Sequence, residues 1–350
     1  MRTRFTLFFG IFSVMALSNA IVPVLPVFAV SSTLQGAVYS AYFFGAFVST
    51  LPGGLLSDRF GRVPVIRTGL GLTLLTGLLL VLTTAPYAVI LLRFAEGVGA
   101  GFFVASAMSA VNYGPAHRQM SGVFMALLNT GLVIGLVVAG LLGTWLANPA
   151  AGIFLFSICS LVPFLTSLLI RESSQAPLSQ GRGSIVTSVK DFRWIWYSSV
   201  ILIGITGVVT SLYPKFSGAS PDRVGIWIAG MSCATIAAVL VASRVTIPPS
   251  TVIRFSAVLM AAGIIVTVVS PWGFVVIGCL AGFVMISQMA ILAGAKEHQG
   301  VVMGMYSTAG YLGMTALPVL AGLVADQAGF FAAFILTALL TLTVVVQPRD

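Results

Sequence analysis

Long apolar segments follow one another along almost the whole chain, and they constrain the fold more than any other feature of the sequence. A helix needs about 20 apolar residues to cross a bilayer. Leu, Val, Ile and Ala dominate these segments, without the period-two alternation of barrel strands, which are about 10 residues long. The predicted spans are 5–30, 34–57, 64–84, 87–112, 120–145, 151–171, 192–213, 223–243, 251–270, 272–294, 300–324 and 328–346.

The composition leads to the same class of protein. Hydrophobic residues make up 58% of the 350 residues and charged residues 7%. A water-soluble domain of this composition could not cover its surface with polar groups, whereas a helix bundle in lipid does not need to. We therefore predict an all-α integral membrane protein with twelve transmembrane helices.

The net charge of +9 indicates a membrane topology rather than nucleic-acid binding, because the basic residues are spread over short loops. Cytoplasmic loops of membrane proteins are rich in Lys and Arg. With an inside N-terminus, the predicted outside loops carry Lys215 and Arg223. The inside segments carry Arg2, Arg4, Arg59, Arg62, Arg67, Arg118, Arg171, Arg182, Lys190, Arg193, Arg244, Arg254, Lys296 and Arg349. Both termini are therefore predicted to be cytoplasmic, in a multi-pass protein of the cytoplasmic membrane.

A long polar stretch, 171–191, divides the chain and reads as a flexible linker. The predicted organisation is an N-terminal six-helix half at 1–171, a cytoplasmic linker at 172–191 and a C-terminal six-helix half at 192–350. The motif Gly-Val-x-Met occurs at 122–125 and again at 300–303, with further matches downstream at the same offset. Such a repeat is expected from the duplication of a six-helix unit.

The residue types that serve cofactor, metal or catalytic sites are scattered. Cys159, Cys233 and Cys279 lie far apart inside predicted spans, where packing is the expected role. The glycines at 97, 99 and 101 lack the strand and full spacing of a dinucleotide fingerprint and are typical of close helix packing. We predict no cofactor, no metal site and no enzymatic activity.

One charged loop carries a family resemblance. Residues 54–62 read Gly-Leu-Leu-Ser-Asp-Arg-Phe-Gly-Arg, which resembles the signature loop between helices 2 and 3 of the major facilitator superfamily, although Val63 replaces the final basic residue. The resemblance implies a secondary transporter with two six-helix halves. It also implies a conformational gate: Gly54 would let helix 2 approach helix 11, and Asp58 would pair with basic residues and a helix N-terminus in the state closed to the cytoplasm. The residues of this predicted gate are Gly54, Asp58, Arg59, Gly61 and Arg62.

Two charges are predicted deep in the fourth span. Arg93-Phe-Ala-Glu96-Gly97 is similar to the Arg-x-x-Gln-Gly motif of the same family, with Glu96 in place of the usual Gln. Counted from Tyr87 at about 1.5 Å per residue, Glu96 lies roughly 14 Å into the membrane. Charge there is costly, so the two residues should face the interior and, at i,i+3 spacing, can partner each other. Glu96 is either a proton or cation site, or part of a static brace with Arg93.

Helices 1 and 5 resemble drug/proton antiporters in part. Residues 131–140 are similar to the Gly-x-x-x-Gly-Pro-x-x-Gly-Gly motif of antiporters, with Leu136 in place of Pro and Ala139 in place of Gly. The first helix carries Pro23 and Pro26, as Pro-rich first helices of antiporters do, but lacks their acid. Candidate residues for a central cavity are Asn19, Tyr39, Tyr42, Asn129, Gln288, Tyr306 and Tyr311.

The function expected from these features is proton-coupled efflux of a small hydrophobic or cationic solute by alternating access. One alternative is proton-coupled uptake of a small metabolite. An alternative of another class is a non-transporting membrane receptor, or the membrane subunit of an ATP-driven pump. The expected partners are a small-molecule substrate, protons and membrane lipid, with no nucleic acid, and we expect a monomer.

Overall fold

The computed structural model of the chain describes residues 2–112, 117–170, 192–242, 247–292 and 299–346, and these ranges contain helices and no strand. The predicted linker at 172–191 lies outside the described residues. Each of the twelve predicted spans overlaps a helix, and the last two fall in one long helical element and the short 3-10 helix that follows it. The class predicted from the sequence, an all-α membrane protein, is confirmed.

The described residues of the N-terminal half form eight helical elements. In chain order they are α1 (Arg2–Ala20), η1 (Val22–Val24), α2 (Leu25–Phe28), α3 (Ser32–Phe60), α4 (Arg62–Val81), α5 (Pro86–Asn112), α6 (His117–Trp145) and α7 (Ala151–Leu168). Pro23 and Pro26 lie where the first predicted span is broken into α1, η1 and α2, because proline lacks the N–H that a continuous helix requires.

The C-terminal half contains α9 (Arg193–Ser217), α10 (Pro221–Ala242), α11 (Pro249–Val269), α12 (Trp272–Leu292), α13 (Gln299–Thr343) and η2 (Val344–Val346). The long element α13 is two helices joined at Gly329, whose backbone has φ 87° and ψ 163°. Glycine alone adopts this conformation routinely. The two helices therefore meet at Gly329, which lies close to the predicted boundary between spans 300–324 and 328–346.

Ten segments of the described chain are long and apolar enough to cross a membrane. One of them, Met305–Val346, contains both helices of α13, and α3 is not among the ten. Large apolar side chains are also exposed on many helices, including Leu82, Leu91, Val269 and Trp272 at 69% or more. Apolar surface of this extent is what a bilayer covers.

The described chain divides into two compact units. The first comprises Met1–Val30, Ala41–Ser179 and Gly218–Ile226, and the second comprises Ser31–Ser40, Gln180–Ser217 and Trp227–Asp350. The helices α3 and α10 therefore each contribute residues to both units.

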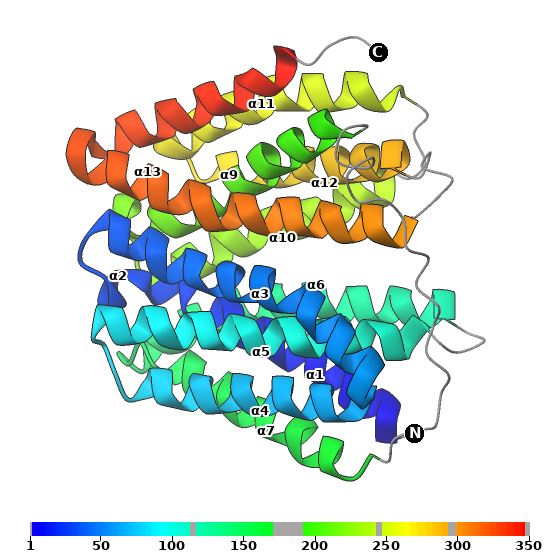
Figure 1. The fold of residues 1–350 in the computed structure, drawn as a ribbon. Helices are drawn as coiled ribbons and strands as arrows, with labels where there is room; N and C mark the ends of the chain where they lie inside the picture. Colours follow the sequence, from blue (N-terminus) through cyan, green and yellow to red (C-terminus); the bar gives the residue numbers. More distant parts are fainter. Residues whose placement is uncertain (1, 113–116, 171–191, 243–246, 293–298, 347–350) are drawn as a thin grey trace. The chain divides into compact units, whose positions relative to one another are not determined.

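The two units repeat one packing order. In the first unit α1 packs on α6 and α7, and α4 packs on α5 and α7; Figure 1 shows α4 and α5 side by side. In the second unit α9 packs on α13, and α11 packs on α12 and on α13. Since α13 contains the fifth and sixth predicted helices of its half, the same neighbours meet in each unit, as expected for a duplicated six-helix unit.

Each unit has its own apolar core. The core of the first contains Ile11, Leu70, Phe103 and Phe124, all fully buried. In the second, the ring of Tyr213 lies edge-on to that of Phe274, with centroids 4.7 Å apart. Packing of this kind between helices holds each unit together in lipid, where no hydrophobic driving force acts between them.

Candidate functional site

The broken first span creates an acceptor inside the bundle. The last carbonyl groups of a helix have no intrahelical donor, and α1 ends at Ala20. One of these groups, the carbonyl of Ser18, accepts a hydrogen bond from Nη2 of Arg93 at 3.0 Å. Next to it, Nδ2 of Asn19 donates to the carbonyl of Leu132 on α6 at 3.2 Å. The break in the first span is thus held by side chains as well as by its own backbone, in which the N–H of Val24 donates to the carbonyl of Ile21 at 3.1 Å.

Arg93 also forms a buried ion pair. Its Nη1 lies 2.7 Å from Oε2 of Glu96, one helical turn further along α5. The two side chains are 1% and 0% exposed. The guanidinium carbon of Arg93 lies 4.7 Å from the ring centre of Tyr42 on α3. Arg93 therefore contacts α1 through Ser18, α3 through Tyr42 and its own helix through Glu96.

Glycines bring α3 close enough to make this contact. A Cβ atom added at Gly97 would collide with the backbone carbonyl of Tyr42, and one at Gly45 would collide with the carbonyl of Phe94. On the other side of α5, a Cβ at Gly99 would lie 2.9 Å from the carbonyl oxygen of Gly69 on α4. The helix-packing role predicted for the glycines at 97 and 99 agrees with this geometry.

Both members of the ion pair retain an unused polar atom. In the part of the chain that the structure describes, Oε1 of Glu96 and Nε of Arg93 are buried without a hydrogen-bond partner. A buried polar group left unsatisfied costs about 1–3 kcal/mol, so such groups in native proteins require an explanation. A hydrogen-bond donor of a ligand beside the carboxylate would satisfy Oε1, and a proton on Oε1 would remove the buried negative charge.

The antiporter-like segment of α6 packs on α1. A Cβ at Gly131 would collide with the carbonyl of Phe12, and one at Gly135 would collide with the carbonyl of Ala16. The small residues of this motif therefore permit a close helix contact one turn before the break in the first span. Leu136, which replaces the expected Pro, is 1% exposed.

The signature loop is a tight turn between two helices. α3 ends at Phe60, α4 begins at Arg62, and Gly61 between them has φ 94° and ψ 158°. The guanidinium of Arg59 lies 5.2 Å from the ring centre of Phe60. The side chain of Asp58 lies outside the described residues, so its predicted pairing stays a prediction.

The close approach predicted at Gly54, between helices of the two units, stays a prediction. The start of α3 makes a close approach within the second unit: a Cβ at Gly36 would collide with the carbonyl of Pro318 on α13.

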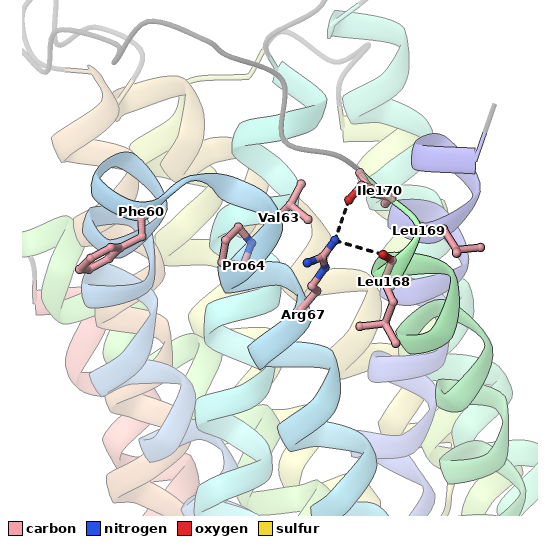
Figure 2. A pocket seen from close by; sticks show the side chains of 7 residues that line it. All are labelled: Phe60, Val63, Pro64, Arg67, Leu168, Leu169 and Ile170. Carbon is pink, nitrogen blue, oxygen red and sulfur yellow. Dashed lines mark hydrogen bonds between the residues drawn. The ribbon is translucent and has the colours of Figure 1, made fainter.

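A pocket of about 500 Å³ lies beside the signature loop. Figure 2 shows Arg67 of α4 pointing at the end of α7, where its Nη2 donates to the carbonyls of Leu168 at 3.3 Å and Ile170 at 2.6 Å. A cation is favourable at a helix C-terminus, and its hydrogen bonds satisfy the last carbonyls. Arg67 therefore joins the loop to α7. The residues around the pocket are Phe60, Val63, Pro64, Arg67, Leu168, Leu169 and Ile170.

The remaining cavity candidates are distributed over both units. Nε2 of Gln288 donates to Oγ of Ser198 at 2.9 Å, while its Oε1 is buried without a partner among the described atoms. The hydroxyl of Tyr306 is likewise buried and unpartnered in this part of the chain. Nδ2 of Asn129 donates to the carbonyl of Met125 on its own helix at 2.8 Å.

Tyr39 and Tyr311 complete the set of candidates. The hydroxyl of Tyr39 lies 3.7 Å from the sulfur of Met314, and the carbonyl of Tyr311 accepts from Thr315 at 2.7 Å. Asn19, Tyr42 and Asn129 belong to the first unit, and Tyr39, Gln288, Tyr306 and Tyr311 to the second. Within the first unit the structure brings Tyr42 to Arg93 and Glu96. The acceptor at Ser18 gave no signal in the sequence because it is a backbone carbonyl, exposed by the helix break near Pro23.

Comparison with known families decides the class to which this arrangement belongs. The family model of the Major Facilitator Superfamily matches residues 7–218, more than half of the chain. The chain belongs to the Major Facilitator Superfamily. The resemblance found in the signature loop is thereby confirmed, and with it the classification of the chain as a multi-pass membrane protein.

Several curated members of the superfamily are similar in sequence. The uncharacterized MFS-type transporter YceJ of Bacillus subtilis is 27% identical over 236 residues, which cover 64% of this chain and 58% of YceJ. The multi-drug resistance efflux pump PmrA of Streptococcus pneumoniae is 29% identical over 52% of this chain and 49% of PmrA. The chain thus matches about half of the length of these two relatives. The multidrug resistance protein MdtG of Dickeya zeae is 27% identical over 87% of this chain and 81% of MdtG.

Solved structures of transporters share the fold. A variant of the nucleoside transporter NupG superposes with a TM-score of 0.80 over 98% of each chain, at 13% identity. A POT family transporter in complex with 5-aminolevulinic acid superposes with a TM-score of 0.78 over 99% of this chain and 94% of its own, also at 13% identity. At such identities the likeness concerns the fold of this superfamily member, not its substrate.

Proposed function

We propose that the chain is a secondary active transporter that moves a small hydrophobic or cationic solute out of the cell in exchange for protons. Its membership of the Major Facilitator Superfamily supports transport by alternating access, in which two halves rock around a site near the middle of the membrane. Three curated relatives support efflux: PmrA is named an efflux pump, and MdtG and MdtM are named multidrug resistance proteins.

One observation carries the coupling to protons: the fully buried carboxyl of Glu96 has one oxygen on Arg93 and one oxygen unpartnered among the described atoms. Ionisable groups inside a membrane protein commonly mark proton pathways. When Glu96 binds a proton at Oε1, its attraction for Arg93 falls, and Arg93 is no longer held in place by its counter-charge. Loading and release of the proton would therefore change the contacts of Arg93 with Ser18 of α1 and Tyr42 of α3.

The orientation belongs to the same proposal. The distribution of Lys and Arg supports cytoplasmic termini, so the signature loop at 54–62 would face the cytoplasm. The start of α3 at Ser32 would face the outside. The protein is expected to work as a monomer in the cytoplasmic membrane.

Transport in proteoliposomes tests the proposal. Purified protein is reconstituted, a pH gradient is imposed, and the movement of a fluorescent lipophilic cation such as ethidium is followed. Wild type should accumulate the dye against its gradient when the pH gradient is present, and should not when the gradient is collapsed. Glu96→Gln should lose this uphill movement and keep downhill exchange, because the amide has the size of the acid but cannot titrate.

Two results would contradict parts of the proposal. Undiminished proton-driven accumulation by Glu96→Gln would remove the coupling role and leave Glu96 as a brace for Arg93. Accumulation that requires ATP and ignores the gradient would assign the chain to an ATP-driven pump. Ser160→Ala is a matched control, since it removes a buried polar group that is not an acid and that bonds to the carbonyl of Phe156 on its own helix, and it should leave the dependence on the gradient intact.

A further inference from the structure

A second copy of the signature pattern lies in α13. Residues 322–329 read Gly-Leu-Val-Ala-Asp-Gln-Ala-Gly, and residues 54–61 read Gly-Leu-Leu-Ser-Asp-Arg-Phe-Gly. Gly, Leu, Asp and Gly occupy the same places in both. The second copy lacks the flanking arginines, so the charge pattern that marks the first loop does not reveal it.

The backbone repeats along with the sequence. Gly61 has φ 94° and ψ 158°, and Gly329 has φ 87° and ψ 163°. Both glycines join two helices directly, in a region of backbone space that is essentially closed to other residues. Each turn thus places an aspartate three residues before the glycine, in the last turn of the preceding helix.

The aspartate of the second copy is bound to the start of α3. Oδ1 of Asp326 accepts from the backbone N–H of Ser32 at 2.8 Å. Oδ2 accepts from the N–H of Thr33 at 2.8 Å and from its hydroxyl at 2.6 Å. The first N–H groups of a helix have no partner within the helix and favour an anion. Asp326 therefore supplies from α13 the cap that α3 does not provide for itself at these two positions.

Lys215 of α9 completes the contact. Its Nζ lies 3.9 Å from Oδ1 of Asp326 and donates to the hydroxyl of Ser32 at 3.3 Å. Lys215 is one of the two basic residues that the charge pattern places outside. The negative charge of Asp326 accounts for its presence there.

The first turns of α3 lie along α13 in a regular register. A Cβ at Gly322 would lie 2.6 Å from the carbonyl oxygen of Ser32, and one at Gly36 would collide with the carbonyl of Pro318. Four residues further on, the hydroxyl of Ser40 donates to the carbonyl of Met314 at 3.3 Å. Each step of four residues forward along α3 therefore corresponds to four residues back along α13, as in an antiparallel pair.

We propose that Asp326 is the outer gate residue of the transport cycle. This proposal rests on transport by alternating access. In the state described here, Asp326 holds the start of α3 against α13 at the outer end. When that end opens, the contact with Ser32 and Thr33 breaks. Asp326 thus controls the opening of the outer end, without touching the solute.

The test measures opening at the outer end. The native cysteines Cys159, Cys233 and Cys279 are replaced by Ser, and Ser40→Cys is then introduced as the reporter. Ser40 is chosen because it is 3% exposed beneath α13 and should become accessible when the outer end opens. The rate of its modification by a water-soluble maleimide is measured on the purified full-length protein. Asp326→Asn should raise this rate at least tenfold. The amide is uncharged and has one acceptor oxygen, so it cannot accept from the N–H groups of Ser32 and Thr33 as the two carboxylate oxygens do.

Controls separate the latch from a general loss of structure. Gln327→Ala changes the exposed neighbour of Asp326 and should leave the rate at the wild-type value. Thr33→Val removes one of the three hydrogen bonds and keeps the backbone donors, so it should raise the rate by a smaller factor. If Asp326→Asn does not fold, as judged by size-exclusion chromatography, Thr33→Val and Lys215→Met carry the test.

The outcomes distinguish this inference from the proposed function. A modification rate in Asp326→Asn equal to that of wild type overturns the outer latch, whatever the transport assay shows. A raised rate in a protein that fails to transport any tested cation retains the latch and rejects the proposed efflux. An equal rise for Gln327→Ala would also overturn the latch, because the effect would then not depend on the carboxylate.

Discussion

The buried pair of Arg93 and Glu96 predicts that Glu96→Gln destabilises the wild-type protein but stabilises a protein that already carries Arg93→Gln. Glu96→Gln leaves a guanidinium that is 1% exposed without its counter-charge. Breaking a buried ion pair from one side costs about 3–5 kcal/mol. The amide oxygen can still accept from Nη1, so we expect the lower end, about 3 kcal/mol of lost unfolding free energy.

Arg93→Gln should be more damaging than Glu96→Gln. It leaves the acid unpaired and also removes the donor to the carbonyl of Ser18, where an unsatisfied buried group costs about 1–3 kcal/mol. It further removes the cation from the ring of Tyr42, a contact of up to about 2 kcal/mol when desolvated. In that background, Glu96→Gln removes the unpaired charge and should restore about 2–3 kcal/mol.

The assay is unfolding by SDS in mixed micelles, carried out on wild type, both single variants and the double variant. Asp222→Asn, at a distant and solvent-accessible acid, is the control and should change stability by the same amount, within about 0.5 kcal/mol, in all backgrounds. If Glu96→Gln destabilises both backgrounds equally, the two charges do not depend on each other, and the reasoning is refuted.

Three further predictions follow from the helix contacts and the loops. Asp58→Asn should leave expression and thermal stability near wild type and cut transport severely, because it changes the balance between two states; equal transport at matched protein amounts would contradict this. Gly97→Leu should lower the yield of folded, monodisperse protein, because its side chain would meet the carbonyl of Tyr42, whereas Gly122→Ala, whose Cβ would meet no described atom within 4 Å, should not. In cells of a Cys-free variant, an impermeant thiol reagent should label a cysteine at Ser217 and spare one at Ser184; labelling at Ser184 would reverse the orientation.

Much of the fold could be predicted because the membrane imposes a simple rule on the sequence. Backbone groups in lipid must be paired within a helix, so each apolar run of sufficient length becomes a span. The break near Pro23 and the join at Gly329 were harder to predict from the sequence. A proline marks where a helix can break, but it does not show that Arg93 will satisfy the freed carbonyl of Ser18.

The site was predicted unevenly. The spacing of Arg93 and Glu96 on one helix was sufficient to place them in contact, because i,i+3 residues share a face. The contact between Tyr42 and Arg93 depends on how closely α3 and α5 cross, and this distance is set by Gly97 and Gly45 together. Asp326 was not predicted, since an aspartate without flanking arginines looks like an ordinary residue at a helix end until its three donors on α3 are known.

The capped break in the first span has a mechanical consequence. A continuous helix resists bending because its backbone hydrogen bonds would stretch, but around Pro23 and Pro26 two of the necessary N–H groups are already missing. The stiffness of this point therefore depends in part on the hydrogen bond from Arg93 to Ser18, which can break and form again without unwinding a turn. The first span can therefore bend near Pro23 and Pro26. The side chain that limits this bending comes from a neighbouring helix, and it is the same one that binds the buried acid.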